Sequence, residues 1–228
     1  IFYSLTGLNW AWSERVTWYI PFLVVSIYSS VSLIRNVFPA LTLWWLSPVI
    51  FLTNTYILMV VGGGQMGVAM AYAVGPLVLA QFVRLEHELT FRRAIITGLL
   101  LSLMILFDPR IAYVLVLCII VFWVVSMVFE KAAHIRYIYF LGIPFVVAGL
   151  VHAFWILPLV MFRINPVENL GAAYSSIASV KFFSFGDFSH ALALLHPNWP
   201  ENLFGKVYFL QPEFFVLPII AFSALIFQ

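Results

Sequence analysis

The densest group of polar side chains in the chain lies between residues 196 and 206. His196, Asn198, Glu201 and Lys206 bring together an imidazole, an amide, a carboxylate and an ammonium group, with Trp199 among them. Amides and carboxylates hydrogen-bond sugar hydroxyls, and an indole ring offers a flat stacking face. The group therefore predicts a binding loop for a polar headgroup. A surface loop whose prolines fix its turns is the alternative.

A second pair of candidate residues flanks Pro109. An aspartate followed by proline is typical of a helix N-cap and first helical position, and we expect Asp108 to cap a helix. The same carboxylate is a candidate ligand for a divalent cation, the one cofactor that the sequence suggests. Arg110 is a candidate for a bidentate contact with a phosphate group, and contact with lipid headgroups is its alternative role.

His152 is the one histidine inside a long apolar run. One interpretation makes it a ligand donor in an outward-facing cavity, one turn from Trp155. The other is a neutral ring that hydrogen-bonds a carbonyl of a neighbouring helix, because polar side chains often hold membrane helices together.

The composition indicates which elements must position these residues. The chain has 228 residues, of which 64% are hydrophobic and 9% charged, whereas soluble domains are about 45–50% apolar and about 25% charged. A soluble fold and a disordered chain are both excluded. The net charge of +2 gives no reason to expect a nucleic-acid partner, so membrane lipids are the expected partners. The single cysteine, Cys118, excludes a disulfide framework.

Apolar runs of about 20 residues predict membrane-spanning helices. We therefore expect an all-α fold, a polytopic transmembrane helix bundle that forms one domain over residues 1–228. The expected spans are 16–34, 37–61, 67–83, 94–107, 111–129, 137–161 and 212–228, the last of them truncated. Ser47-Pro48 predicts a break in the second span, and Gly62-Gly63-Gly64 predicts its end. The chain begins without Met and ends in an apolar run, so we expect a central fragment.

Orientation follows from the basic residues of the short connections. Arg35, Arg84, Arg92, Arg93, Lys131 and Arg136 fall in alternate connections, which should face the cytoplasm. The long connection 162–211 then lies on the extracytoplasmic side, as short interfacial helices rich in Phe, Trp and Tyr. We expect an integral protein of a prokaryotic plasma membrane.

The middle of the chain resembles the middle of GT-C-type multispanning glycosyltransferases. The resemblance rests on the stretch from Gly63 to Leu77, on the basic loop after it, and on the apolar helix that ends in Phe107-Asp108-Pro109-Arg110. The resemblance covers about residues 37–228. It implies a polyprenyl-phosphate sugar as donor and chemistry at the outer face. The family carries its catalytic carboxylate in the first outer loop. The only early acidic residue here is Glu14, in an ordinary helix start, so no catalytic residue transfers.

Two other functions compete with a lipid-linked-sugar transferase. One is a transporter or flippase for a lipid or small solute, and the other is a non-catalytic membrane scaffold subunit. The six complete spans contain no Asp, Glu, Lys or Arg, which disfavours ion-coupled transport. In the complete protein, an outer loop with an acidic residue upstream would favour the transferase, and inverted repeats would favour transport.

Overall fold

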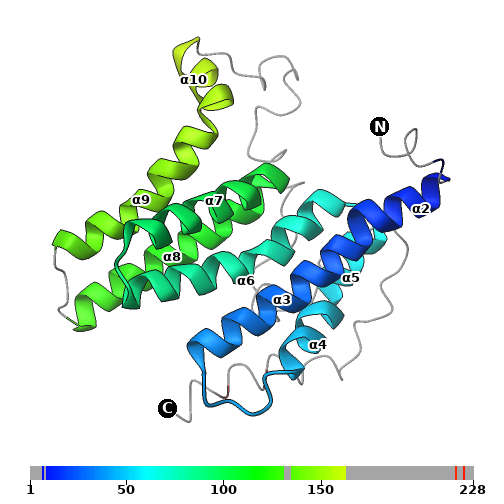
Figure 1. Ribbon diagram of the computed structural model, residues 1–228, viewed down its shortest axis with the longest axis horizontal. Helices are drawn as coiled ribbons and strands as arrows, with labels where there is room; N and C mark the ends of the chain where they lie inside the picture. Colours follow the sequence, from blue (N-terminus) through cyan, green and yellow to red (C-terminus); the bar gives the residue numbers. More distant parts are fainter. Residues whose placement is uncertain (1–6, 8, 131–134, 163–218, 220–222, 224–228) are drawn as a thin grey trace. The chain divides into compact units, whose positions relative to one another are not determined.

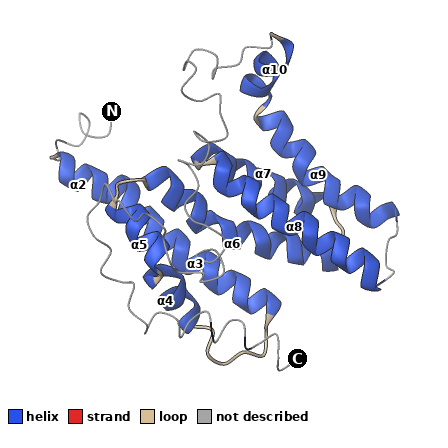
Figure 2. Cartoon of the chain, turned by 180° about the vertical axis from the view of Figure 1, so that it is seen from behind, coloured by secondary structure: helices blue, strands red, loops and turns tan. Residues whose placement is uncertain are grey.

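A computed structural model of the chain describes residues 7, 9–130, 135–162, 219 and 223 (Figure 1). The regular elements of this part are all helices (Figure 2). The expected outer loop lies outside the described residues except for Phe162, and so does the expected last span except for Ile219 and Ser223. The helices are α2 (Trp10–Glu14), the π-helical turn η1 (Arg15–Tyr19), α3 (Ile20–Val37), α4 (Leu46–Thr53), α5 (Thr55–Gly62), α6 (Met66–His87), α7 (Phe91–Phe107), α8 (Pro109–Glu130), α9 (Ile135–Val151) and α10 (Ala153–Met161).

The chain divides into two compact units. The first comprises residues 1–52 and 64–157, and the second comprises 53–63 and 158–228. The first unit contains the helices that carry Asp108, Arg110 and His152, and the description below concerns this unit unless stated.

Two described helices are long and apolar enough to cross a membrane. They are the continuous helix Trp10–Val37, formed by α2, η1 and α3, and α6. A third would be α9 with α10, whose apolar parts, Tyr139–Val151 and Ala153–Met161, meet at a bend of 78°. Asn9 begins the first helix, because its side chain accepts a hydrogen bond from the Trp12 N–H at 3.0 Å. The expected spans 16–34 and 67–83 lie on these long helices.

Two further expected spans lie on α7 and α8. Residues 94–107 belong to α7, which has 17 residues, and residues 111–129 belong to α8, which has 22 residues. Within the described residues, the structure therefore supports a membrane protein with two to three spanning helices by length and composition.

The expected span 37–61, predicted to be broken near Ser47, differs from the structure at its beginning and in a second break. The first helix ends at Val37, turns follow over 38–45, and α4 and α5 have eight residues each. Eight helical residues cover only about 12 Å. The structure does contain the break expected near Ser47, because the turns end there and α4 begins at Leu46, one residue before it. The chain breaks again at Asn54, whose Oδ1 accepts a hydrogen bond from the Ile57 N–H at 3.0 Å and so caps α5.

Five described helices of the first unit, α3, α6, α7, α8 and α9, pack against one another. Ser29 of α3 donates to the Ala73 carbonyl of α6 at 2.6 Å, and nearer their C-terminal ends Arg84 Nε donates to Asn36 Oδ1 at 2.6 Å. The helices α3 and α6 therefore run parallel. The short connection 88–90 turns α7 back along α6, and α9 runs parallel to α7 (Figure 1). The buried apolar core lies between α6, α7, α8 and α9.

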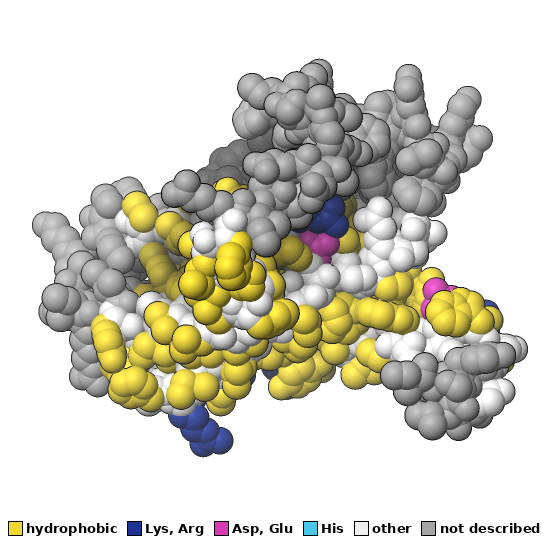
Figure 3. All heavy atoms as spheres, turned by 90° about the horizontal axis from the view of Figure 1, so that it is seen from above, with side chains coloured by type: hydrophobic (Ala, Val, Ile, Leu, Met, Phe, Trp, Pro, Cys, Tyr) yellow, Lys and Arg dark blue, Asp and Glu magenta, His cyan; other side chains and the backbone are white. Residues whose placement is uncertain are grey.

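This arrangement gathers the basic residues at one end. The C-terminal ends of α3 and α6 and the beginning of α7 bring Arg35, Arg84, Arg92 and Arg93 to the same end of the helices. The connection from α7 to α8, with Asp108, lies at the opposite end. Hydrophobic side chains cover much of the described lateral surface in Figure 3. Such a surface is expected of helices that face lipid.

The helices α7 and α9 approach each other most closely at Gly98. A Cβ atom there would lie 2.6 Å from Val147 Cβ and 2.8 Å from the Pro144 carbonyl oxygen. We expect Gly98→Ala to lower the free energy of unfolding by about 1–3 kcal/mol, because the helices must separate to admit the methyl group. Chemical unfolding in detergent measures this.

Gly142 is the matched control, because it lies on α9 and a Cβ there meets nothing within 4 Å. Gly142→Ala should leave stability unchanged or raise it by up to about 1 kcal/mol. Equal effects of the two substitutions would contradict the close packing at Gly98.

Candidate functional site

The predicted cap at Asp108 is confirmed. Asp108 Oδ1 accepts hydrogen bonds from the backbone N–H groups of Arg110, at 2.8 Å, and Ile111, at 3.4 Å, and α8 begins at Pro109. The Arg110 side chain folds back onto the same carboxylate. Its Nη2 donates to Oδ2 at 2.6 Å and its Nε to Oδ1 at 3.1 Å. The Asp108 carboxylate thus caps α8 and forms the ion pair with Arg110 at the same time.

The two partners differ in exposure. The Asp108 side chain is 8% exposed and that of Arg110 is 64% exposed. Burial alone raises the pKa of the Asp108 carboxyl, but the hydrogen bonds and positive charge of Arg110 outweigh burial, and the pKa lies below its ordinary value. Asp108 is therefore a carboxylate at neutral pH, and Arg110 places a cation at the surface beside it.

His152 is buried between α7 and α9. The residue is 3% exposed, and its Nε2 lies 3.0 Å from the backbone oxygen of Ser102 on α7. Its Nδ1 lies 2.9 Å from Trp155 Nε1. The structure thus contains the helix-to-helix hydrogen bond that the packing interpretation of His152 predicted.

These two contacts also determine which nitrogen of the His152 ring carries the proton. An indole N–H can only donate, so His152 Nδ1 must accept. A carbonyl can only accept, so Nε2 carries the proton and donates to Ser102. The arrangement requires a neutral imidazole with the proton on Nε2. A doubly protonated ring would set two N–H groups against each other at Trp155.

The same residue lies at the bend between α9 and α10. The helix α9 ends at Val151 and α10 begins at Ala153, and their axes differ by 78°. The prolines in this region, Pro144 and Pro158, lie inside the two helices rather than at the bend. His152 joins α9 to α7 and, through Trp155, joins the first turn of α10 to α9.

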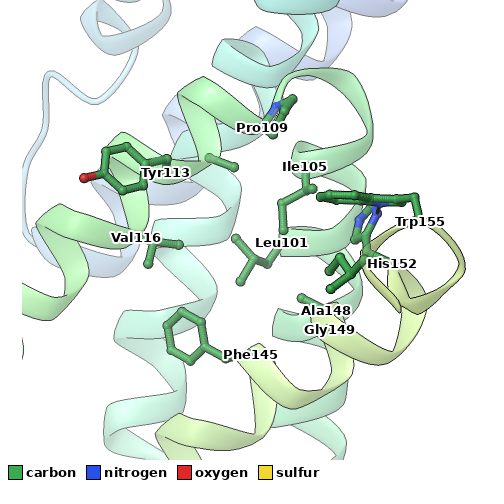
Figure 4. A pocket seen from close by; sticks show the side chains of 12 residues that line it. Leu101, Ile105, Pro109, Tyr113, Val116, Phe145, Ala148, Gly149, His152 and Trp155 are labelled. Carbon is green, nitrogen blue, oxygen red and sulfur yellow. Dashed lines mark hydrogen bonds between the residues drawn. The ribbon is translucent and has the colours of Figure 1, made fainter. Parts of the chain in front are cut away.

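An apolar pocket of about 300 Å³ lies between α7, α8, α9 and the first turn of α10 (Figure 4). In Figure 4 the ring of Trp155 extends toward Ile105, and the hydroxyl of Tyr113 points away from the cavity. The two nitrogens of His152 and the Trp155 N–H are already paired. The pocket is therefore suited to a hydrocarbon group and not to a sugar. Its lining residues are Leu101, Ile105, Pro109, Ala112, Tyr113, Val116, Phe145, Ala148, Gly149, His152, Trp155 and Ile156.

Three of the residues proposed from the sequence lie at or beside this pocket. His152 lines it, and Asp108 and Arg110 flank Pro109, which also lines it. The remaining candidates, His196, Asn198, Glu201 and Lys206, lie outside the described residues.

The possible metal role of Asp108 gains no supporting observation. Within the described part of the chain, no group of three or more His, Cys, Asp or Glu side chains is placed to hold a metal ion. Both carboxylate oxygens of Asp108 accept hydrogen bonds from Arg110.

Sequence reasoning missed most of the pocket lining. The spacing of three residues between His152 and Trp155 did place both on one helix face. Nothing in the sequence distinguished Gly149 or Ala148 from the other small residues of the apolar runs, although both line the pocket.

Comparisons of the chain with protein-family models, with curated proteins and with solved structures find no match. The resemblance to GT-C-type glycosyltransferases therefore stays a proposal.

The contact between His152 and Trp155 can be measured with a double-mutant cycle. Each of His152→Ala and Trp155→Phe removes the same hydrogen bond, so the two should be non-additive by about 0.5–1.5 kcal/mol in the free energy of unfolding. Strictly additive effects would contradict the bond.

The ion pair can be separated from the helix cap with Asp108→Asn, because asparagine caps helices as well as aspartate does. A lowered pKa stabilises the fold above the unfolded-state pKa, about 3.9, and this contribution is lost as pH falls through the folded-state value. Wild type should thus be more stable than Asp108→Asn at pH 7 and lose that advantage below about pH 4. Unfolding measured across this range tests it; a difference independent of pH would contradict the ion pair.

Proposed function

We propose that the chain belongs to an integral membrane protein that binds a lipid-linked substrate at the Asp108 end of its helices. The reaction we propose is transfer of a sugar from a polyprenyl-phosphate carrier at the extracytoplasmic face. The resemblance described above and the distribution of basic residues support this reaction and this orientation.

One observation carries the proposal. The nitrogens of His152 and Trp155 in the lining of an apolar pocket are paired, the Tyr113 hydroxyl points away from the cavity (Figure 4), and the lining residue Pro109 is followed in the chain by the exposed Arg110. A lipid-linked sugar has two parts that match these features, because its hydrocarbon chain would fit the apolar pocket and its phosphate would pair with the arginine. A volume of about 300 Å³ lies at the lower end of the range for small-molecule pockets, about 300–1,000 Å³. The pocket would thus hold part of the chain.

Arg110 is the residue we propose for the phosphate. A guanidinium group can donate two parallel hydrogen bonds to a phosphate as it does to the Asp108 carboxylate. Asp108 would hold the arginine in place. It is a poor candidate for the general base, because a carboxylate with a lowered pKa accepts protons weakly. The catalytic carboxylate of this reaction is not assigned to any described residue.

A transporter or flippase is the second candidate. The 78° bend at His152 and the breaks at 38–45 and Asn54 favour it, because interrupted helices are common in transporters. Coupling to ions has little support in the described part, where Asp108 and His152 are the only buried Asp, Glu, Lys, Arg or His residues.

Filling the pocket tests the proposed function. Gly149 lines the pocket, and a Cβ atom there meets nothing within 4 Å, so Gly149→Leu places a side chain in the cavity without a clash at its first atom. We expect at least tenfold weaker binding of a polyprenyl phosphate to the complete protein in detergent, and a similar loss of sugar transfer. Gly142→Leu, on the same helix and away from the pocket, should bind like wild type.

The headgroup is tested separately with Arg110→Ala. This variant should weaken binding of the polyprenyl phosphate and leave binding of the unphosphorylated polyprenol unchanged. Unaltered lipid binding by Gly149→Leu would refute the pocket. Lipid binding without any sugar transfer, but with lipid movement between leaflets of a vesicle, would favour the flippase.

A further inference from the structure

The segment between α3 and α4, residues 38–45, has an unusual composition for a turn. Its sequence is Phe-Pro-Ala-Leu-Thr-Leu-Trp-Trp, and Thr42 is its only polar side chain. The backbone makes local turns, with the Leu41 N–H donating to the Phe38 carbonyl at 3.1 Å and the Leu46 N–H donating to the Leu43 carbonyl at 3.0 Å. Turns in water are usually built from Gly, Asn, Asp and Ser.

The large side chains of this segment point outward. Phe38, Leu41, Leu43 and Trp45 are between 43% and 58% exposed. Such a surface is costly in water. The centre of a bilayer is also excluded, because a turn leaves backbone polar groups that hydrocarbon cannot satisfy. The headgroup region satisfies both requirements, since it offers apolar contact and hydrogen-bonding groups at one depth, and tryptophan is enriched there.

A cation accompanies the aromatic residues. The guanidinium carbon of Arg35 lies 4.0 Å from the ring centre of Trp44, within range of a cation–π interaction. Stacking uses the face of the guanidinium and leaves the N–H groups on its edge to donate. In the described part of the chain, no carboxylate forms an ion pair with Arg35.

The surroundings of Arg35 are positive. Asn36, the next residue, accepts the hydrogen bond from Arg84 Nε, so a second arginine is tied to the end of α3. Four arginines and two glutamates lie at this end of α3, α6 and α7, and Glu88 is paired with Arg93 at 2.6 Å. An excess of positive charge beside an apolar surface matches the charge of an anionic lipid surface.

We propose that residues 38–45 insert into the headgroup region of the bilayer and that Arg35, whose guanidinium carbon lies over the Trp44 ring, binds the phosphate of an anionic phospholipid. A lipid surface fits better than a protein partner for two reasons. Exposed apolar side chains are also present on the adjoining α4, at Val49 and Ile50. The cation lies at the helix ends, where headgroups lie when α3 crosses the membrane. This site is independent of the pocket at the opposite end of the helices.

Depth measurement tests the insertion. In the complete protein carrying Cys118→Ser, which removes the exposed native thiol, Leu43→Cys is labelled with a polarity-sensitive fluorophore and reconstituted into vesicles. Thr90→Cys is the control, an exposed position in the α6–α7 connection at the same end. We expect blue-shifted emission at position 43 that lipids brominated near the headgroup quench, and water-like emission at position 90. Equal, water-like emission at both positions would overturn the insertion.

Lipid selectivity tests the arginine site. Binding of phosphatidylglycerol relative to phosphatidylcholine is measured on the purified protein for Arg35→Gln, Trp44→Leu and Arg92→Gln, after circular dichroism confirms equal helix content. We expect about a fivefold loss of phosphatidylglycerol preference in Arg35→Gln, a smaller loss in Trp44→Leu, and little change in Arg92→Gln. Equal losses in Arg35→Gln and Arg92→Gln would show a diffuse charge effect and overturn the site. Competition by soluble glycerol phosphate at equal concentration would also overturn it.

Discussion

The contact between α7 and α9 is the interaction on which the rest of the described site depends. Gly98 lets the two helices approach until backbone and side chain nearly touch, and His152 adds a hydrogen bond to the Ser102 carbonyl further along the same interface. The pocket lies beside this interface and is lined by residues of α7, α8, α9 and α10. The bend at His152 then brings Trp155 over its edge.

Several polar side chains in these helices form hydrogen bonds to backbone carbonyls, some within their own helix and some on a neighbouring one. Thr17 and Thr97 donate to carbonyls one turn earlier, at Ser13 and Arg93, whereas Ser29 and His152 reach a neighbouring helix. Such bonds let polar side chains lie in an apolar environment and connect helices that lipid would not drive together. In the described part of the chain, the bonds of Ser29 and His152 thus connect neighbouring helices, whereas those of Thr17 and Thr97 stay within one helix.

The two ends of the helices differ in construction. At one end Arg110 is fixed by a buried carboxylate beside an apolar pocket. At the other end Arg35 is stacked on Trp44 beside an exposed apolar turn. Arg110 pairs with a carboxylate and Arg35 lies over an indole ring, and we propose a lipid-linked phosphate as the ligand of the first and a phospholipid headgroup as the ligand of the second. The proposed substrate site and the proposed headgroup site thus each rely on an arginine, and the two arginines differ in the group that holds them.

The sequence by itself determined the helical class, the membrane environment and the cap at Asp108, because composition and a neighbouring Asp-Pro pair act locally. It also suggested a bond from His152 to another helix, but not its partner, Ser102, fifty residues away. Within the span 37–61, the sequence predicted the break near Ser47 but not the turns over 38–45 or the second break at Asn54, because hydropathy does not report backbone breaks, and Phe, Leu and Trp are as apolar in a turn as in a helix. The pocket and the Arg35–Trp44 stack were decided only by tertiary structure, since each depends on how separate segments meet in space.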